Sequence, residues 1–162
     1  MFNRRHPDFL GMGVLTNLLG GYFGSRLMTN LREEKGLTYN VYAALDTFLH
    51  DGYLYIGAEV GNKKVKQAMQ EIYREMEKLK EEPVPEEELS MLRTYMLGNL
   101  LNLIDGPFNV AEVYKGLAMD GNSPEFFHRF VETVKHISAE ELQALARQYL
   151  QREEFWEVVV GP

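Results

Sequence analysis

LGGYFGSRLMTNLREEKGLTYNVYA, residues 19–43, is the stretch that decides the fold. Its glycine pair Gly20-Gly21 follows apolar residues at helical spacing and predicts a tight turn with a left-handed cap. Ser25 is a suitable cap for a short second helix, which we expect to end at Gly36. From there the pattern becomes β-branched and aromatic, which predicts a strand over 37–43. The stretch therefore predicts a change from helix to sheet.

The residues on either side extend this pattern. Upstream, apolar side chains recur at helical spacing from Pro7 to Leu19, which predicts a first helix. Downstream, Asp51-Gly52 is a favoured hairpin turn pair, and the alternating residues 53–60 predict a second strand. A β-hairpin with an irregular middle therefore follows the helical beginning.

Helices dominate the remainder of the chain. Asn62 is a suitable cap for a long amphipathic helix, whose apolar stripe consists of Val65, Met69, Ile72, Met76 and Leu79. Further helices are predicted over 86–104, 110–119, 123–136 and 138–150, the last opened by the capping box Ser138-Ala139-Glu140-Glu141. The residues 155–160 predict a terminal third strand.

The order of these elements indicates the fold class. About six helices against three strands, without regular crossovers between the strands, favour an α+β domain. We expect residues 1–162 to form a single domain with a small, largely antiparallel sheet and helices packed on one face. Because three strands make a thin sheet, the pattern also indicates that the sheet expects one more strand than this sequence supplies.

The composition is typical of a soluble globular domain. The 162 residues are 45% hydrophobic and carry a net charge of -7, from 17 Lys+Arg against 24 Asp+Glu. This excess of negative charge disfavours nucleic acid and anionic membranes as partners. The absence of cysteine excludes disulfides and thiol nucleophiles. No stretch is long and apolar enough to predict a membrane span, and nothing in the sequence indicates a localisation.

Two motifs that could suggest ligand sites have simpler explanations. Residues 20–25 are rich in glycine, but they lack the Gly-Lys-Ser/Thr ending of a phosphate-binding loop, which favours a tight turn. His128, Glu132 and His136 share one helical face, but the two histidines lie two turns apart, which favours ordinary half-exposed residues over a metal site. A free-standing hydrolase built on the scattered histidines therefore has little support.

The stretch 19–43 closely resembles the signature of the carboxy-terminal half-domains of insulinase/pitrilysin-type zinc peptidases, which include the mitochondrial processing peptidase. That signature runs leucine, glycines, Ser-Arg-Leu and then Arg-Glu-x-x-Gly-Leu-x-Tyr, and the same residues stand here in the same order. The opening His6-Pro7-Asp8, the hairpin, the long acidic helix and the final strand continue the resemblance over essentially the whole chain. The implied fold is a processing-peptidase-like half-domain.

The resemblance also implies a part in peptide hydrolysis. In that family one half-domain carries an inverted zinc motif, H-x-x-E-H, and the other supplies an arginine and a tyrosine that contact the peptide substrate. The matching residues are Arg32 and Tyr39, which are therefore the implied catalytic residues. An arginine can hold a peptide carbonyl or carboxylate, and a phenol can donate to a developing oxyanion. Without the resemblance, the simpler interpretation is that Arg32 forms a surface ion pair with a neighbouring glutamate. Tyr39 would then be an ordinary tyrosine of the sheet.

The sequence also departs from the family pattern. It contains no H-x-x-E-H motif, so we expect no metal or cofactor site in this chain and zinc in a partner half-domain or sister subunit. The strand that usually precedes His-Pro-Asp is missing too, so we expect Met1 to lie inside a longer peptidase. Two alternatives stay open: a substrate-binding half of an active zinc endopeptidase that acts on short or unfolded polypeptides, and a non-catalytic structural or peptide-holding subunit. An incomplete sheet further predicts a homodimer.

Overall fold

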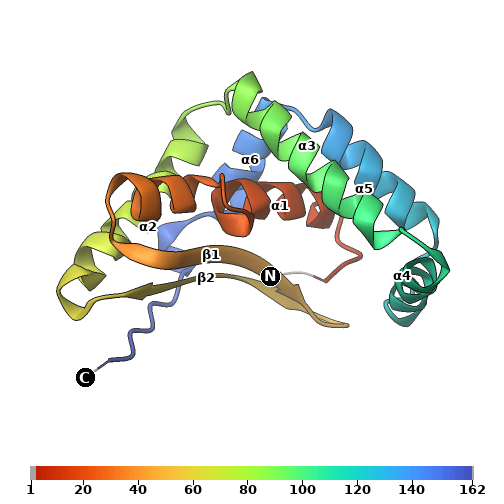
Figure 1. Ribbon diagram of the computed structural model, residues 1–162, viewed down its shortest axis with the longest axis horizontal. Helices are drawn as coiled ribbons and strands as arrows, with labels where there is room; N and C mark the ends of the chain where they lie inside the picture. Colours follow the sequence, from red (N-terminus) through yellow and green to blue (C-terminus); the bar gives the residue numbers. More distant parts are fainter. Residues whose placement is uncertain (1–2, 162) are drawn as a thin grey trace.

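A computed structural model describes residues 3–161, in which α-helices pack against one side of a β-hairpin (Figure 1). Met1, on which the expectation of a longer protein rests, lies outside the described residues. The chain begins with α1 (Phe9–Thr16), which continues into the π-helical turn η1 (Asn17–Gly21), and the next helix, η2 (Met28–Glu34), is π-helical as well. Both lie over the hairpin, and the change from helix to sheet falls where residues 19–43 predict it.

The elements that follow the hairpin match the predicted helices closely. They are η3 (Asn62–Lys64), α2 (Val65–Glu81), α3 (Glu86–Leu103), α4 (Pro107–Met119), α5 (Glu125–His136), α6 (Ala139–Tyr149) and η4 (Arg152–Glu154). The predicted capping box at the start of α6 is formed, because the Ser138 hydroxyl accepts from the Glu141 backbone and the Glu141 carboxylate accepts from the Ser138 backbone. Helices on one face of a small antiparallel sheet confirm the predicted α+β fold class.

The hairpin consists of β1 (Thr38–Thr47) and β2 (Gly52–Val60), which pair in antiparallel register. Side chains alternate between its two faces. The inner face carries the buried residues Val41 and Ala43 and packs against α1, η1 and η2. β1 extends four residues beyond the strand predicted over 37–43. Regular strand pairing therefore takes the place of the irregular middle that the sequence indicated.

A single core joins the helices to this inner face. Its largest fully buried side chains come from the first two helical segments, from α2 and α3, and from α6 and the residue that follows it: Met12, Leu15, Leu18, Leu19, Leu27, Leu31, Met76, Leu79, Leu89, Leu92, Leu142 and Leu150. The predicted stripe of α2 is thus buried in its second half, whereas Val65 and Met69 are only half-buried. Burial of this kind stabilises the fold by roughly 1.5–3 kcal/mol per large apolar side chain.

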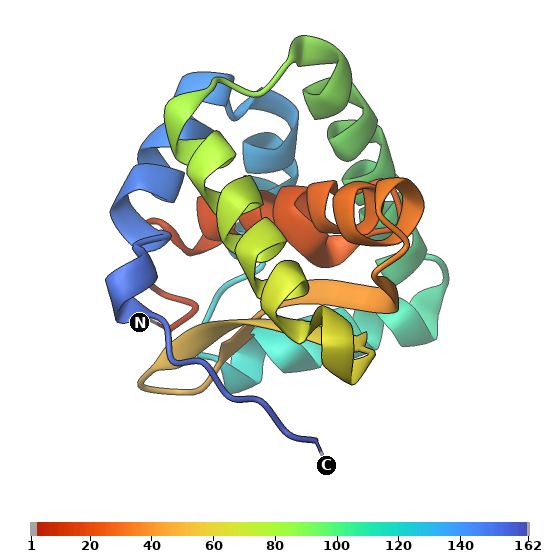
Figure 2. The same ribbon diagram turned by 90° about the vertical axis from the view of Figure 1, so that its left-hand side faces the viewer.

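The predicted third strand is wrong. Phe155 packs against the core, and residues 156–161 then leave the body past the end of the hairpin; residues 155–161 form no strand pairing with any described residue (Figure 2). Trp156 is 96% exposed, and Val158 and Val160 are exposed as well. An alternating apolar segment becomes a strand only beside an open partner edge. Among the described residues the outer edge of β2 is open, but the segment does not pair with it.

The predicted helix caps are also partly wrong. The Ser25 hydroxyl is buried without a hydrogen-bond partner among residues 3–161, and the residue joins η2 instead through its carbonyl, which accepts from Thr29 at 2.9 Å. Asn62 starts the turn η3, so Lys64 and not Asn62 precedes α2. A cap preference belongs to a single residue, so it gives the wrong helix start when an extra 3₁₀ turn such as η3 precedes the α-helix.

The glycines of residues 19–43 act in two different ways. Gly36 has a left-handed φ of +55°, and the Leu37 amide donates to the Leu31 carbonyl at 2.7 Å, so the predicted end of the second helix is confirmed. Gly20 is not left-handed, which makes the predicted cap there wrong. A Cβ at Gly20 would lie 2.5 Å from the backbone nitrogen of Ala43, so this glycine lets the helix approach β1 closely.

Candidate functional site

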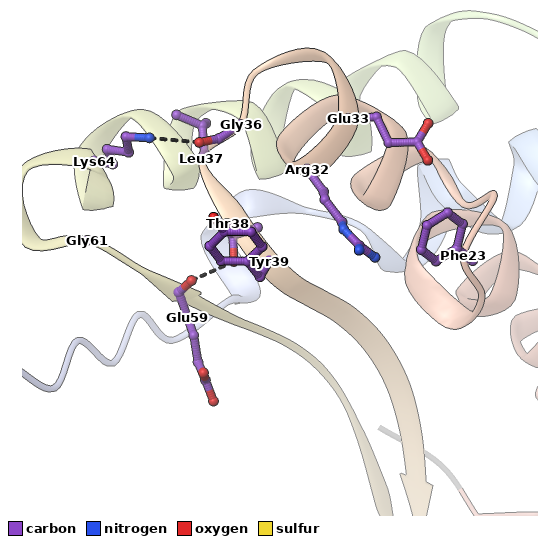
Figure 3. A pocket seen from close by; sticks show the side chains of 10 residues that line it. All are labelled: Phe23, Arg32, Glu33, Gly36, Leu37, Thr38, Tyr39, Glu59, Gly61 and Lys64. Atoms are coloured by element: carbon purple, nitrogen blue, oxygen red, sulfur yellow. Dashed lines mark hydrogen bonds between the residues drawn. The ribbon is translucent and has the colours of Figure 1, made fainter.

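A cavity of about 610 Å³ lies where η2 ends and β1 begins, and both Arg32 and Tyr39 line it (Figure 3). Phe23 and η2 form one wall, and Glu59 and Lys64 belong to the opposite wall. The structure therefore brings the two residues singled out from the sequence to one concave surface. It adds Phe23, Glu59 and Lys64, which the sequence did not single out.

Arg32 is held by an aromatic ring and not by a carboxylate. The carbon of its guanidinium lies 4.6 Å from the centre of the Phe23 ring, which is 60% exposed. Figure 3 shows the side chain extending from η2 toward this ring. Within residues 3–161 the guanidinium forms no ion pair, so the surface ion pair with a neighbouring glutamate is not found. A cation over a ring face keeps its hydrogen-bond donors free.

Tyr39 owes its orientation to a β-bulge. Asn40 pairs with Glu59 and Thr38 with Val60, which leaves Tyr39 as the extra residue of β1. Tyr39 and Asn40 consequently both face solvent, and Tyr39 is 91% exposed. Its hydroxyl has no hydrogen-bond partner in the part of the chain that the structure describes.

Thr38 fixes this bulge. The Thr38 side chain is buried, and its hydroxyl donates to the carbonyl of Glu59 across the hairpin (Figure 3). The same oxygen accepts from the Asn40 amide at 3.1 Å. The buried threonine therefore ties both sides of the extra residue, so that the phenol of Tyr39 is presented from a braced backbone.

A polar network holds η2 against α2. The Asn30 side chain donates to the Glu75 carboxylate at 2.5 Å, and the Lys35 ammonium donates to the Asn30 oxygen at 2.9 Å. Lys35 also pairs with Glu71, and this hydrogen bond is the main reason why the pKa of Glu71 is lowered. Glu75 is only 3% exposed, and its carboxylate accepts from Asn30 and pairs with Lys78. The network fixes the helix from which Arg32 projects.

One feature of the sequence indicates this network. Glu75 stands three residues after Ile72 and directly before Met76, inside the apolar face of α2. A carboxylate in the middle of an apolar face requires a buried partner. The sequence does not show that the partner is Asn30, which lies 45 residues away along the chain.

Lys64 closes the opposite side of the cavity. Its ammonium donates to the Gly36 carbonyl at 2.7 Å, which joins the start of α2 to the turn between η2 and β1 (Figure 3). The rim thus carries the cations Arg32 and Lys64 together with the carboxylates of Glu33 and Glu59. Such a mixed rim suits a polypeptide backbone better than a strongly charged small molecule.

The family model described as "Peptidase M16 inactive domain" matches residues 2–96, which is more than half of the chain. The chain belongs to the M16 peptidase family. The resemblance drawn from residues 19–43 is thereby confirmed: this M16 domain is a carboxy-terminal half-domain of the insulinase type.

Relatives of this M16 domain include zinc proteases. An uncharacterized zinc protease of Mycobacterium bovis is 28% identical over 93% of this chain, and the uncharacterized zinc protease YmxG of Bacillus subtilis is 32% identical over 59%. The matched regions cover only 34% and 24% of those proteins. Among solved structures, a peptidase M16 inactive domain from Pseudomonas fluorescens has a TM-score of 0.81, at 20% identity, over 93% of this chain and 36% of that chain. This last similarity concerns the fold alone.

The described residues offer no ligand set for a zinc ion. Among residues 3–161, no group of three or more His, Cys, Asp or Glu side chains is placed to hold a metal. Glu132 contacts Lys135 at 3.1 Å and His136 at 3.2 Å, and its pKa is lowered mainly by Lys135.

No helix in the described residues is long and apolar enough to cross a membrane.

Proposed function

We propose that this M16 domain is the substrate-binding half of a zinc-dependent endopeptidase, whose zinc and catalytic glutamate lie in another half-domain or a sister subunit. One observation carries the proposal: Arg32 and Tyr39 line one cavity, and neither has a polar partner within residues 3–161. Polar groups that are oriented but not engaged are available for a ligand. The names of the relatives as zinc proteases support the peptidase class.

The proposed ligand is a short or unfolded polypeptide. The Arg32 guanidinium offers several donors in one plane, which suits a peptide carbonyl or a terminal carboxylate. The Tyr39 hydroxyl donates to a peptide carbonyl oxygen, and this hydrogen bond strengthens when the oxygen gains negative charge. Because the Phe23 ring and the bulge orient the two groups beforehand, little ordering remains to be done on binding.

We further propose a second copy of this chain as a partner. The exposed apolar segment 155–160 and the open edge of β2 both lack a strand partner among the described residues. Unpaired backbone groups beside apolar side chains favour strand addition, and a two-fold pair would cover the same surface on both copies.

Binding of an unfolded polypeptide tests the proposed function. Labelled α-lactalbumin, reduced and carbamidomethylated so that it stays unfolded, is titrated with the chain and followed by fluorescence anisotropy. Arg32→Ala and Tyr39→Phe are each expected to weaken binding by about fivefold to tenfold, the effect of losing one exposed charged or polar hydrogen bond. Arg129→Ala and Tyr114→Phe are matched controls, because Arg129 also lies over a ring, Phe126, and Tyr114 is an exposed tyrosine of α4. Equal affinity for all five proteins would contradict the proposal.

A further inference from the structure

We propose that the outer face of the hairpin binds an extended polypeptide that carries two basic side chains about six residues apart. The inference rests on the proposed function, because it extends the path of the same polypeptide out of the cavity. It concerns the tyrosine face, defined as Tyr42, Tyr53, Tyr55 and Phe48. The helices α1, η1 and η2 pack on the opposite face of the hairpin (Figure 1).

The four rings of the tyrosine face form a continuous row. Ring centres are 5.7 Å apart for Tyr42 and Tyr55, 5.7 Å for Tyr55 and Tyr53, and 5.9 Å for Tyr53 and Phe48. Tyr42 is 41% exposed, Tyr53 47% and Phe48 60%. A row of contacting aromatic rings that stays open to solvent is typical of a binding surface and not of a core.

A glycine shapes this row. Tyr42 lies opposite Gly57 in the hairpin register, and a Cβ at Gly57 would lie 2.5 Å from the Tyr42 ring. The ring therefore lies across the neighbouring strand, where any other residue would displace it. The glycine makes the surface flat at this position, which suits a ligand that runs along the strands.

Two carboxylates lie along the row, Asp46 beside Tyr53 near one end and Glu59 past Tyr42 at the other. Asp46 lies opposite Tyr53, and Glu59 lies opposite Asn40 and also lines the cavity. Neither carboxylate forms an ion pair within residues 3–161, and Asp46 accepts a hydrogen bond from the Tyr53 hydroxyl at 3.3 Å. The pKa of Tyr55 is raised, mainly by the negative charge of Asp46, so the field of this carboxylate reaches the middle of the row. The tyrosine face thus carries negative charge at two points along its length, beside Tyr53 and past Tyr42.

The chemistry of this surface selects its ligand. Arg and Lys side chains bind both to ring faces and to carboxylates, so a basic polypeptide is complementary at each point. Tyr53, which lies opposite Asp46, and Glu59 are six residues apart along β2, or roughly 20 Å. An extended ligand covers this length in about six residues, and an even spacing keeps both basic side chains on the same side. Glu59 joins this path to the cavity of Arg32 and Tyr39.

Two synthetic peptides of equal charge test the spacing. Both are labelled, otherwise Gly/Ser sequences with two arginines, which are six residues apart in one peptide and seven in the other. The chain is expected to bind the even-spaced peptide at least roughly threefold to fivefold more tightly, because the odd spacing turns one arginine away from the face. The double variant Asp46→Asn/Glu59→Gln should abolish this preference. The double variant Asp105→Asn/Glu87→Gln, which removes two exposed carboxylates elsewhere, should retain it.

The outcomes separate this inference from the proposed function. Equal affinity for the two peptides, or a preference that survives Asp46→Asn/Glu59→Gln, would overturn the inference while the effects of Arg32→Ala on unfolded α-lactalbumin stand. A preference that depends on Asp46 and Glu59, together with no effect of Arg32→Ala and Tyr39→Phe on α-lactalbumin, would support the tyrosine face and contradict the proposed clamp. Thermal melts of each variant establish that it is folded, as expected for exposed positions on a hairpin.

Discussion

The guanidinium of Arg32 lies 4.6 Å above the centre of the Phe23 ring, in the cavity that Tyr39 also lines. The contact links the end of η2 to the glycine-rich turn that precedes it. It holds a positive charge in the cavity of Tyr39, and within residues 3–161 this charge forms no ion pair. Phe23 is therefore a positioning residue for Arg32.

Replacing Phe23 by leucine tests this contact. Phe23→Leu should weaken binding of unfolded α-lactalbumin by about twofold to fivefold, which is the strength of an exposed cation–π contact. Phe23→Tyr should restore it. Proton NMR provides the direct readout, because the ring shifts the Arg32 side-chain resonances and leucine does not. The corresponding change at the ring under Arg129, Phe126→Leu, serves as the control. Unshifted Arg32 resonances in the native chain would contradict the contact.

Two glycines of the first helical segment should respond oppositely to alanine. Gly20→Ala places a methyl group 2.5 Å from the Ala43 nitrogen and 2.8 Å from its Cβ, and backbone atoms cannot move aside, so we expect a loss of about 1–3 kcal/mol in the free energy of unfolding. At Gly13 a Cβ meets nothing within 4 Å, so Gly13→Ala should stabilise α1 by about 0.5–1 kcal/mol. Urea denaturation measures both, and equal effects would contradict the close approach of η1 to β1.

Acid should destabilise the junction of η2 and α2. The pKa of Glu71 is lowered below its ordinary value of 4.5, first by the hydrogen bond from Lys35. The contribution of Glu71 is therefore complete above the unfolded-state pKa and is lost as the pH falls through the lower folded-state pKa. Glu71→Gln should be less stable than the native chain at pH 7, and the difference should vanish at low pH. A difference that is constant with pH, measured by urea denaturation, would contradict this account.

The exposed terminal segment should drive self-association. We expect a dimer at micromolar concentration in light scattering, because Val158 and Val160 are exposed and unpaired. Val158→Asp should yield a monomer, whereas Phe108→Asp, on the exposed side of α4, should leave the dimer intact. A native chain that is strictly monomeric and melts in one sharp transition would show that the two-stranded sheet is sufficient by itself.

The hairpin and most helices could be predicted because their signals are local. Ser138 with Glu141 fixes the start of α6. The hairpin forms where the alternating residues predict it, but Asp51-Gly52 is not its turn, because Gly52 already pairs with Thr47 and residues 48–51 form the connection. Arg32 and Tyr39 reach the same cavity because a left-handed turn at Gly36 connects the end of a helix directly to a strand. Each of these features depends on residues within one turn of each other.

The remaining features depend on contacts that are distant in the sequence. Glu75 is buried because it binds Asn30, and the order of residues does not reveal that pair. The bulge at Tyr39 arises from the pairing of Thr38 and Asn40 with another strand. Residues 155–160 have the composition of a strand, but whether they pair depends on contact with a strand that is distant in the sequence. The ring of Phe23 meets Arg32 only after the intervening turn has folded.

Turnover is the most direct test of the central claim, that this M16 domain supplies Arg32 and Tyr39 to a zinc site carried elsewhere. The chain is combined with the half-domain of the protease that carries the H-x-x-E-H motif, and cleavage of a fluorescence-quenched peptide is followed. We expect no cleavage by the chain alone, cleavage by the two halves together, and a loss of about 10²-fold in kcat for Tyr39→Phe. If the two halves bind the peptide without cleaving it, the result favours a peptide-holding subunit. Cleavage by the chain alone, or an unchanged kcat for Tyr39→Phe, would contradict the account.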